Sequence, residues 1–220
     1  MKHPALKSLL FAALLYIAGA ASFAATADVD PELLAIQQAW ATANYEVPAG
    51  SAREAAFEAL SRRAAAYVER NPGHAEPLIW EGIVLSTYAG AKGGLGALGL
   101  AKQARDRLEA AIAIDGNALD GSAYTSLGSL YSKVPGFPIG FGNDKKAREY
   151  LEKGLAINPD GIDSNYFYGE YLYGHGDIAK AQAHLDKALK AAPRPQRESA
   201  DAGRRQDIAV VAAKAKSRQG

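Results

Sequence analysis

The sequence predicts an all-α fold, a right-handed α-solenoid of antiparallel helix pairs that ends in a C-terminal capping helix. The clearest evidence is an ordered set of small and large residues in the C-terminal third: Gly169 and Ala188 are small, Leu172 and Leu185 are large, and Pro193 follows. Small residues let two helices approach closely, large residues fill the seam, and proline ends the second helix. This order is typical of a helix-turn-helix repeat of about 34 residues.

The same order occurs twice more upstream, with extra residues inserted between the paired helices. The middle copy has Tyr124, Leu127, Gly128 and Tyr131 in its first helix and Ala147, Leu151, Gly154 and Pro159 in its second. The first copy has Leu78, Gly82 and Leu85, then Ala104, Leu108 and Ala111, with Gly116 where proline is usual. These residues resemble the tetratricopeptide repeat (TPR) family over residues 75–195, where we expect three repeats.

The mature chain is predicted to be helical throughout. The expected helices span 31–45, 51–70, 75–89, 98–114, 120–132, 144–157, 163–174, 177–191 and 197–217. Residues 28–72 form an N-terminal helix pair that is compatible with a diverged repeat. Residues 196–220 hold the capping helix, whose apolar face is Ile208, Val211, Ala212 and Ala215. Such a terminal helix usually covers the open end of a repeat stack.

The N-terminus predicts export. Residues 1–27 read as a signal peptide, with Lys2 and Lys7 before an apolar stretch and Ala25-Thr26-Ala27 as a small-x-small cleavage site. Cleavage after Ala24 is the alternative, and an uncleaved anchor is the other interpretation of the stretch. We expect a periplasmic protein after cleavage near Ala27, without stable membrane insertion of the mature chain.

Two loops are predicted where the repeat order is interrupted, at 90–99 and at 134–143. The first is rich in glycine, but it lacks the lysine and hydroxyl residue that end a phosphate-binding loop. The second carries Phe137, Ile139 and Phe141. These side chains either plug the helix stack or present an apolar contact for a ligand or partner.

The segments Val134–Ala147 and Asn158–Gly169 resemble exported bacterial TPR proteins, a group related to the TPR-type periplasmic components of TRAP (tripartite ATP-independent periplasmic) transporters. The resemblance implies an accessory role in solute transport. Those components are often lipoproteins that form trimers, whereas the chain has no cysteine to carry a lipid. Tethering and trimer assembly are therefore not expected to follow from the resemblance.

The concave surface of a TPR stack is lined by its first helices, and the template assigns a polar, hydroxyl-rich lining here. The candidate binding residues are Ser122, Thr125, Ser129, Asp163, Tyr166, Glu170 and Tyr173, and the template also places Ser132, Glu76, Ile79, Ile83 and Ser86 on this face. A tyrosine offers stacking area and a hydroxyl to a peptide or a small polar ligand. The alternative is that the tyrosines pack against the next helix.

Composition and motifs favour a binding protein over an enzyme. The net charge of +1 gives no reason to expect a nucleic-acid partner. His175 and His184 lack a carboxylate at a metal-ligand spacing, and no nucleophile motif occurs, so we expect no cofactor, no metal and no catalytic residue. The basic tail from Arg194 is interpreted as a solvated helix face, or else as a contact for an acidic partner or membrane. The leading function is protein–protein interaction or complex assembly with an unidentified protein or peptide; the alternative is a small-ligand-binding accessory of a TRAP-type transporter.

Overall fold

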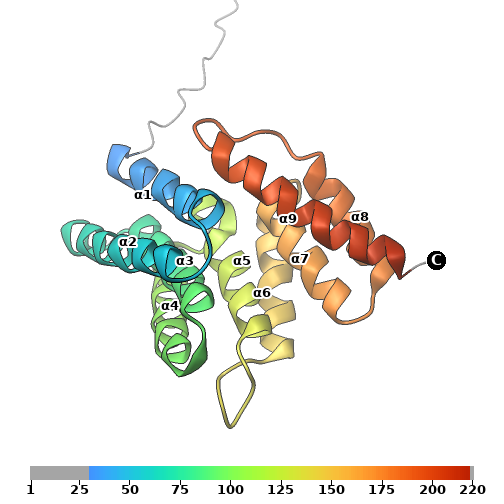
Figure 1. Ribbon diagram of the computed structural model, residues 1–220, viewed down its shortest axis with the longest axis horizontal. Helices are drawn as coiled ribbons and strands as arrows, with labels where there is room; N and C mark the ends of the chain where they lie inside the picture. The colour runs from blue at the N-terminus through green and yellow to red at the C-terminus, as the bar shows by residue number, and fades with distance from the viewer. Residues whose placement is uncertain (1–29, 219–220) are drawn as a thin grey trace, which may run out of the picture.

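The computed structural model describes residues 30–218, and the regular elements of this part of the chain are all helical. The predicted signal peptide over 1–27, with its two cleavage sites, lies outside the described residues. The elements are α1 (Pro31–Ala41), the π-helical turn η1 (Thr42–Glu46), α2 (Ser51–Arg70), α3 (Ala75–Lys92), α4 (Gly94–Asp115), α5 (Ala118–Lys133), α6 (Asp144–Ile157), α7 (Ile162–Gly174), α8 (Ile178–Leu189) and α9 (Glu198–Ser217). Figure 1 shows how they follow one another around the molecule. Among these helices, none combines the length and apolar character that a bilayer span requires.

Successive helices pack as pairs, α3 with α4, α5 with α6 and α7 with α8. Glycine at the seam makes the close approach possible. A Cβ atom on Gly128 would lie 2.7 Å from the Leu151 Cγ and 2.8 Å from the Leu151 backbone nitrogen. Leu127, Leu151, Leu172 and Leu185 are fully buried around these seams. The small and large residues therefore occupy the places that the repeat order assigned to them.

The prediction of a loop at residues 90–99 is wrong. Helix α3 continues to Lys92 and α4 begins at Gly94, so almost all of this segment is helical. The whole turn is made by Gly93 and Gly94, whose φ angles of 62° and 59° are easily reached only without a side chain. The glycine content indicated a long loop, but two glycines suffice for the turn. The second predicted loop, at 134–143, is present between α5 and α6.

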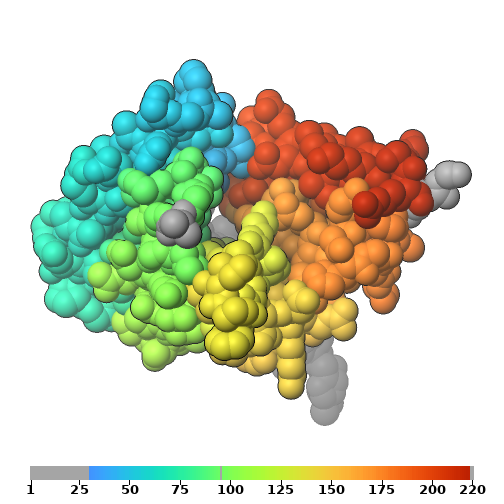
Figure 2. All heavy atoms as spheres, turned by 60° about the horizontal axis from the view of Figure 1, so that its bottom comes forward, coloured from blue at the N-terminus to red at the C-terminus, as the bar shows by residue number. Residues whose placement is uncertain are grey.

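Helix α9 carries the predicted apolar face, with Ile208 and Ala215 fully buried against α7 and α8. It also reaches back to the other end of the chain and contacts α1 and η1. The Tyr45 hydroxyl donates to Asp207 Oδ2 over 3.0 Å, and the Ser199 hydroxyl donates to Glu46 Oε1 over 3.0 Å. The N-terminal and C-terminal segments therefore meet, as Figure 2 shows for the blue and red surfaces, and α9 does more than cover an open end.

Candidate functional site

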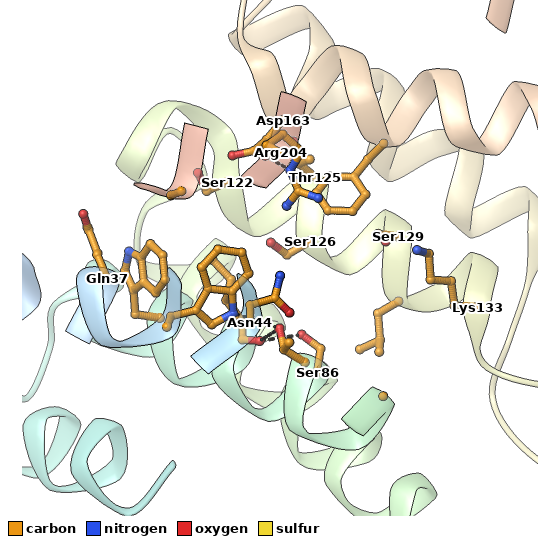
Figure 3. A pocket seen from close by; sticks show the side chains of 18 of the residues that line it. Gln37, Asn44, Ser86, Ser122, Thr125, Ser126, Ser129, Lys133, Asp163 and Arg204 are labelled. Atoms are coloured by element: carbon orange, nitrogen blue, oxygen red, sulfur yellow. Dashed lines mark hydrogen bonds and ion pairs between the residues drawn. The ribbon is translucent and has the colours of Figure 1, made fainter. Parts of the chain in front are cut away.

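Where the two ends of the solenoid meet, the concave face forms a cavity of about 1030 Å³ that remains partly open to solvent. Its walls come from α1, η1, α2, α3 and α4 on one side, from α5 on the facing side, and from α7 and residues 191–204. In Figure 3, Asn44 and Ser86 lie across the cavity from Ser122, Ser126 and Ser129. Residues that are far apart in the sequence thus share one concave site.

The N-terminal wall is aromatic. Trp40 and Trp80 line it and meet edge to face, with ring centroids 6.1 Å apart. The Trp40 Nε1–H donates to Thr87 Oγ1 over 3.0 Å, which fixes the orientation of the indole. Phe57, fully buried, supports the same wall. Trp40 and Trp80 are rigidly packed, with 7% and 4% of their surface exposed, so this wall offers a ligand a small apolar contact of fixed geometry.

The facing wall carries hydroxyl groups. Ser122, Thr125 and Ser129, all named from the sequence, line the cavity together with Ser126. Just before them, Leu119 and Asp120 adopt left-handed backbone angles, with φ values of 48° and 55°, and both also line the cavity. Backbone strain of this kind in residues with side chains costs about 1–3 kcal/mol each and tends to occur at functional sites.

An ion-pair network forms the C-terminal wall. Asp163, also named from the sequence, accepts from Arg204 Nε over 2.7 Å and from Arg194 Nη1 over 2.6 Å. The same arginines reach Asp207 and Asp201. Burial alone would raise the pKa of the Asp163 carboxyl, but the guanidinium groups of Arg204 and Arg194 outweigh it and hold the pKa well below its usual range. Asp163 is therefore a charged member of the wall at neutral pH.

Tyr166 and Tyr173 lie under α9 rather than in the cavity lining, and Glu170 is ion-paired with Lys133 of α5. Tyr166 is buried, its ring is covered by the Arg204 guanidinium at 4.6 Å, and its hydroxyl lies 3.4 Å from Glu170. Tyr173 is partly buried, with Arg218 4.7 Å from its ring centroid. Helix α9 thus covers the part of the concave face that the template left open. Binding roles for these three residues stay predictions from the sequence.

The loop at 134–143 divides its apolar residues between two environments. Phe141 packs edge to face on Tyr131, with ring centroids 5.4 Å apart, and lies under the Arg105 guanidinium. Phe137 and Ile139 are 93% and 71% exposed, and Ile139 also borders the cavity. Phe141 therefore packs against the helix stack, whereas Phe137 and Ile139 are exposed. Among residues 30–218, no group of three potential metal-ligating side chains comes together.

Comparison with known proteins addresses the fold. No protein family matches the chain, and no curated protein matches it. A solved structure that it resembles is that of a thermophilic TPR protein from Thermus thermophilus, with a TM-score of 0.55 and 18% identity over 84% of this chain and 96% of that chain. The chain has a TPR-like fold. An identity of this size supports the architecture alone.

Sequence reasoning missed the tryptophans and arginines of this TPR-like site. Trp40 lies in the N-terminal helix pair, outside the three expected repeats, so the template assigned it no place on the concave face. The arginines belong to the basic tail, whose interpretation as a solvated face is wrong for Arg194 and Arg204 because both are held in ion pairs and Arg204 is only 8% exposed. One signal was available: Asp201 and Arg204 continue the apolar stripe of Ile208 and Ala215 at helical spacing, which predicts that they face inward.

Proposed function

We propose that this protein is a non-enzymatic binding protein whose ligand lies in the central cavity. The observation that carries this proposal is the contact of α9 with α1 and η1, which turns the concave face from an open groove into a cavity wall. A volume near 1030 Å³ is at the upper end of the range for small-molecule sites, about 300–1,000 Å³. Aromatic area with a few polar groups is also the usual lining of such sites.

The ligand is either a small organic molecule or a short peptide segment. The cavity supports the first more strongly, because an extended partner would need a groove that is open along its length. In a transport setting, this function corresponds to the small-ligand-binding accessory of a TRAP-type transporter. The test is native mass spectrometry of protein purified without denaturation, comparing Ser126→Phe, which narrows the cavity between its facing walls, with Ser217→Phe on the exposed end of α9. Co-purified mass lost only in the first variant supports the proposal, whereas equal occupancy in both would argue against the cavity.

A second candidate is protein–protein interaction or complex assembly, which the exposed loop favours. Phe137 and Ile139 stand on a protruding hairpin, and exposed apolar side chains of this kind often mark interaction sites. We expect Phe137→Ser with Ile139→Ser to abolish site-specific crosslinking from the loop to a partner protein in intact cells. Crosslinks that persist at wild-type yield would exclude this loop as the contact.

We further propose that the protein acts in the periplasm. The support is the basic start, apolar stretch and cleavage site within residues 1–27. Cell fractionation followed by N-terminal sequencing tests this location. A mature protein that begins at Asp28 or Ala25 in the periplasmic fraction is the expected result, and an intact Met1 in the cytosol would contradict it.

A further inference from the structure

Arg197 differs from Arg194 and Arg204, the other two arginines of the C-terminal wall, because it has no carboxylate partner among residues 30–218. Its Nη1 donates to the Gln37 side-chain oxygen over 3.1 Å, and its guanidinium lies 5.0 Å from the Trp80 ring centroid. Its Nε is buried and has no acceptor within the described part of the chain. Arg194 and Arg204, by contrast, are neutralised by Asp163, Asp201 and Asp207.

The electrostatic surroundings make this position unfavourable for a positive charge. Burial and the nearby charges of Arg194 and Arg204 lower the pKa of Arg197 to about 10, although Asp163 and Asp201 act in the opposite direction. The side chain is therefore still a cation at neutral pH. A mostly buried guanidinium is normally paired with an anion, because desolvation of an unpaired charge is unfavourable.

The other cations of the lining already have partners. Lys133 forms an ion pair with Glu170 at 2.9 Å, and Arg53 donates twice to the Val47 backbone carbonyl at 3.0 and 2.8 Å. Arg197 also adjoins the aromatic wall, since Trp80 lies under its guanidinium and Trp40 packs on Trp80. Arg197, whose buried Nε–H has no acceptor among the described residues, thus lies beside an apolar aromatic surface in the same cavity.

We propose that the cavity takes a ligand that joins an anionic group to an apolar, aromatic body, with the anion on Arg197 and the body against Trp40 and Trp80. This inference rests on the proposed cavity-binding function and names its ligand class. A guanidinium presents several N–H donors in a planar fork, which suits carboxylate, sulfonate or phosphate oxygens. Because Arg197 also bonds Gln37 of α1, such an anion would sit at the seam between the two ends of the chain.

The experiment uses two probes with the same body. 8-Anilinonaphthalene-1-sulfonate carries a sulfonate, and N-phenyl-1-naphthylamine lacks it. Both tryptophans of the chain line the cavity, so quenching of intrinsic fluorescence detects binding, and its loss in Ser126→Phe assigns the binding to the cavity. We expect the full-length protein to bind the sulfonate at least tenfold more tightly than the neutral probe.

Arg197→Gln should remove most of this preference, with a loss of about tenfold in sulfonate affinity and little change for the neutral probe. Arg197→Lys should retain part of it, because the charge remains while the planar fork is lost. Arg62→Gln on the exposed face of α2 is the matched control for net charge and should bind like the wild type. Circular dichroism verifies that each variant is folded.

The outcomes separate the two proposals. Quenching by both probes with equal affinity in the wild type would overturn the anion proposal and leave cavity binding supported, a result that needs no variant to fold. An Arg197→Gln variant that keeps the wild-type preference would also overturn the role of Arg197. The absence of quenching by either probe would overturn both the cavity function and the ligand class.

Discussion

At the scale of single residues, the charge of Asp163 holds the C-terminal wall of the cavity together. Asp163 lies on α7 and forms ion pairs with Arg194, before α9, and with Arg204, on α9. Its carboxylate contacts Arg204 and Arg194, so Asp163→Asn would leave the buried Arg204 guanidinium with less compensation. We expect a loss of about 2–3 kcal/mol in the free energy of unfolding, less than for a fully buried pair because 33% of the Asp163 side chain is exposed. Equilibrium unfolding in urea measures this loss in the free energy of unfolding. Asp160→Asn is the control, since Asp160 is 85% exposed and should change stability by less than about 0.5 kcal/mol.

The same carboxyl predicts how stability depends on pH. Its pKa in the folded protein is lowered, whereas in the unfolded chain it is near 3.9. The stabilisation is therefore fully present above about pH 4 and is lost as the pH falls through the unfolded value toward the folded one. The difference in Tm between the wild type and Asp163→Asn should be largest at neutral pH and should narrow below pH 4. A constant difference from pH 7 to pH 2.5 would contradict this assignment.

The seam glycines give a graded prediction at the same scale. A Cβ on Gly128 would meet the Leu151 backbone, which cannot move aside, whereas on Gly169 it would meet mainly the Leu185 side chain at 3.1 Å. Gly128→Ala should therefore destabilise by about 1–3 kcal/mol and Gly169→Ala by less. Gly99→Ala, in α4 with open space around it, should stabilise by about 0.5–1 kcal/mol. Chemical denaturation of the three variants tests the order, and a Gly128 variant as stable as the wild type would refute the packing at this seam.

At the scale of elements, the sequence predicted most helix bounds because they depend on local signals. Asp30 caps α1 through its side chain, as an aspartate before a proline indicates, and the boundaries of α2 and α6 agree with the prediction to the residue. The turn between α3 and α4 was missed because the sequence does not distinguish one glycine of residues 90–99 from another, whereas in the structure only Gly93 and Gly94 of this segment have positive φ angles. The concave hydroxyls of α5 followed from the resemblance to the TPR template, which assigns those positions to the concave face. The place of Arg197 in the cavity lining could not be predicted from the sequence, because it depends on the contact of Arg197 with α1 in the folded chain.

The α3–α4 turn supplies the element-scale prediction. Gly93 combines a φ of 62° with a ψ of −175°, a conformation that is essentially restricted to glycine. Gly93→Ala should cost about 1–3 kcal/mol in the free energy of unfolding. Gly90→Ala, within helix α3 and with open space around it, should be neutral or stabilising. Equal unfolding midpoints for the two variants would mean that Gly93 does not hold this turn.

At the scale of the whole molecule, the contact of α9 with α1 and η1 determines whether the concave face is an open groove or a cavity. It joins residues about 160 positions apart, and it depends on the summed rotation of every helix pair, so no local pattern in the sequence carries it. The template placed hydroxyls on a concave face, where they line the cavity, but it left that face open. The arginines that close it looked like a solvated tail, because their partners become neighbours only in the folded chain.

Gly203 is where this closure is most easily tested. A Cβ at this position would overlap the ring of Tyr45, so Gly203→Ala should push α9 away from η1 and widen the cavity. The chain has no cysteine, so spin labels can be attached through single cysteines at the exposed positions Thr42 and Gln206. Pulsed electron resonance should give a narrow distance distribution in the wild type and a longer, broader one in Gly203→Ala. Ala202→Ser, at the exposed neighbouring position, should leave the distribution unchanged. If Gly203→Ala also matched the wild type, the two ends would be held together by contacts other than the packing of Gly203 on Tyr45.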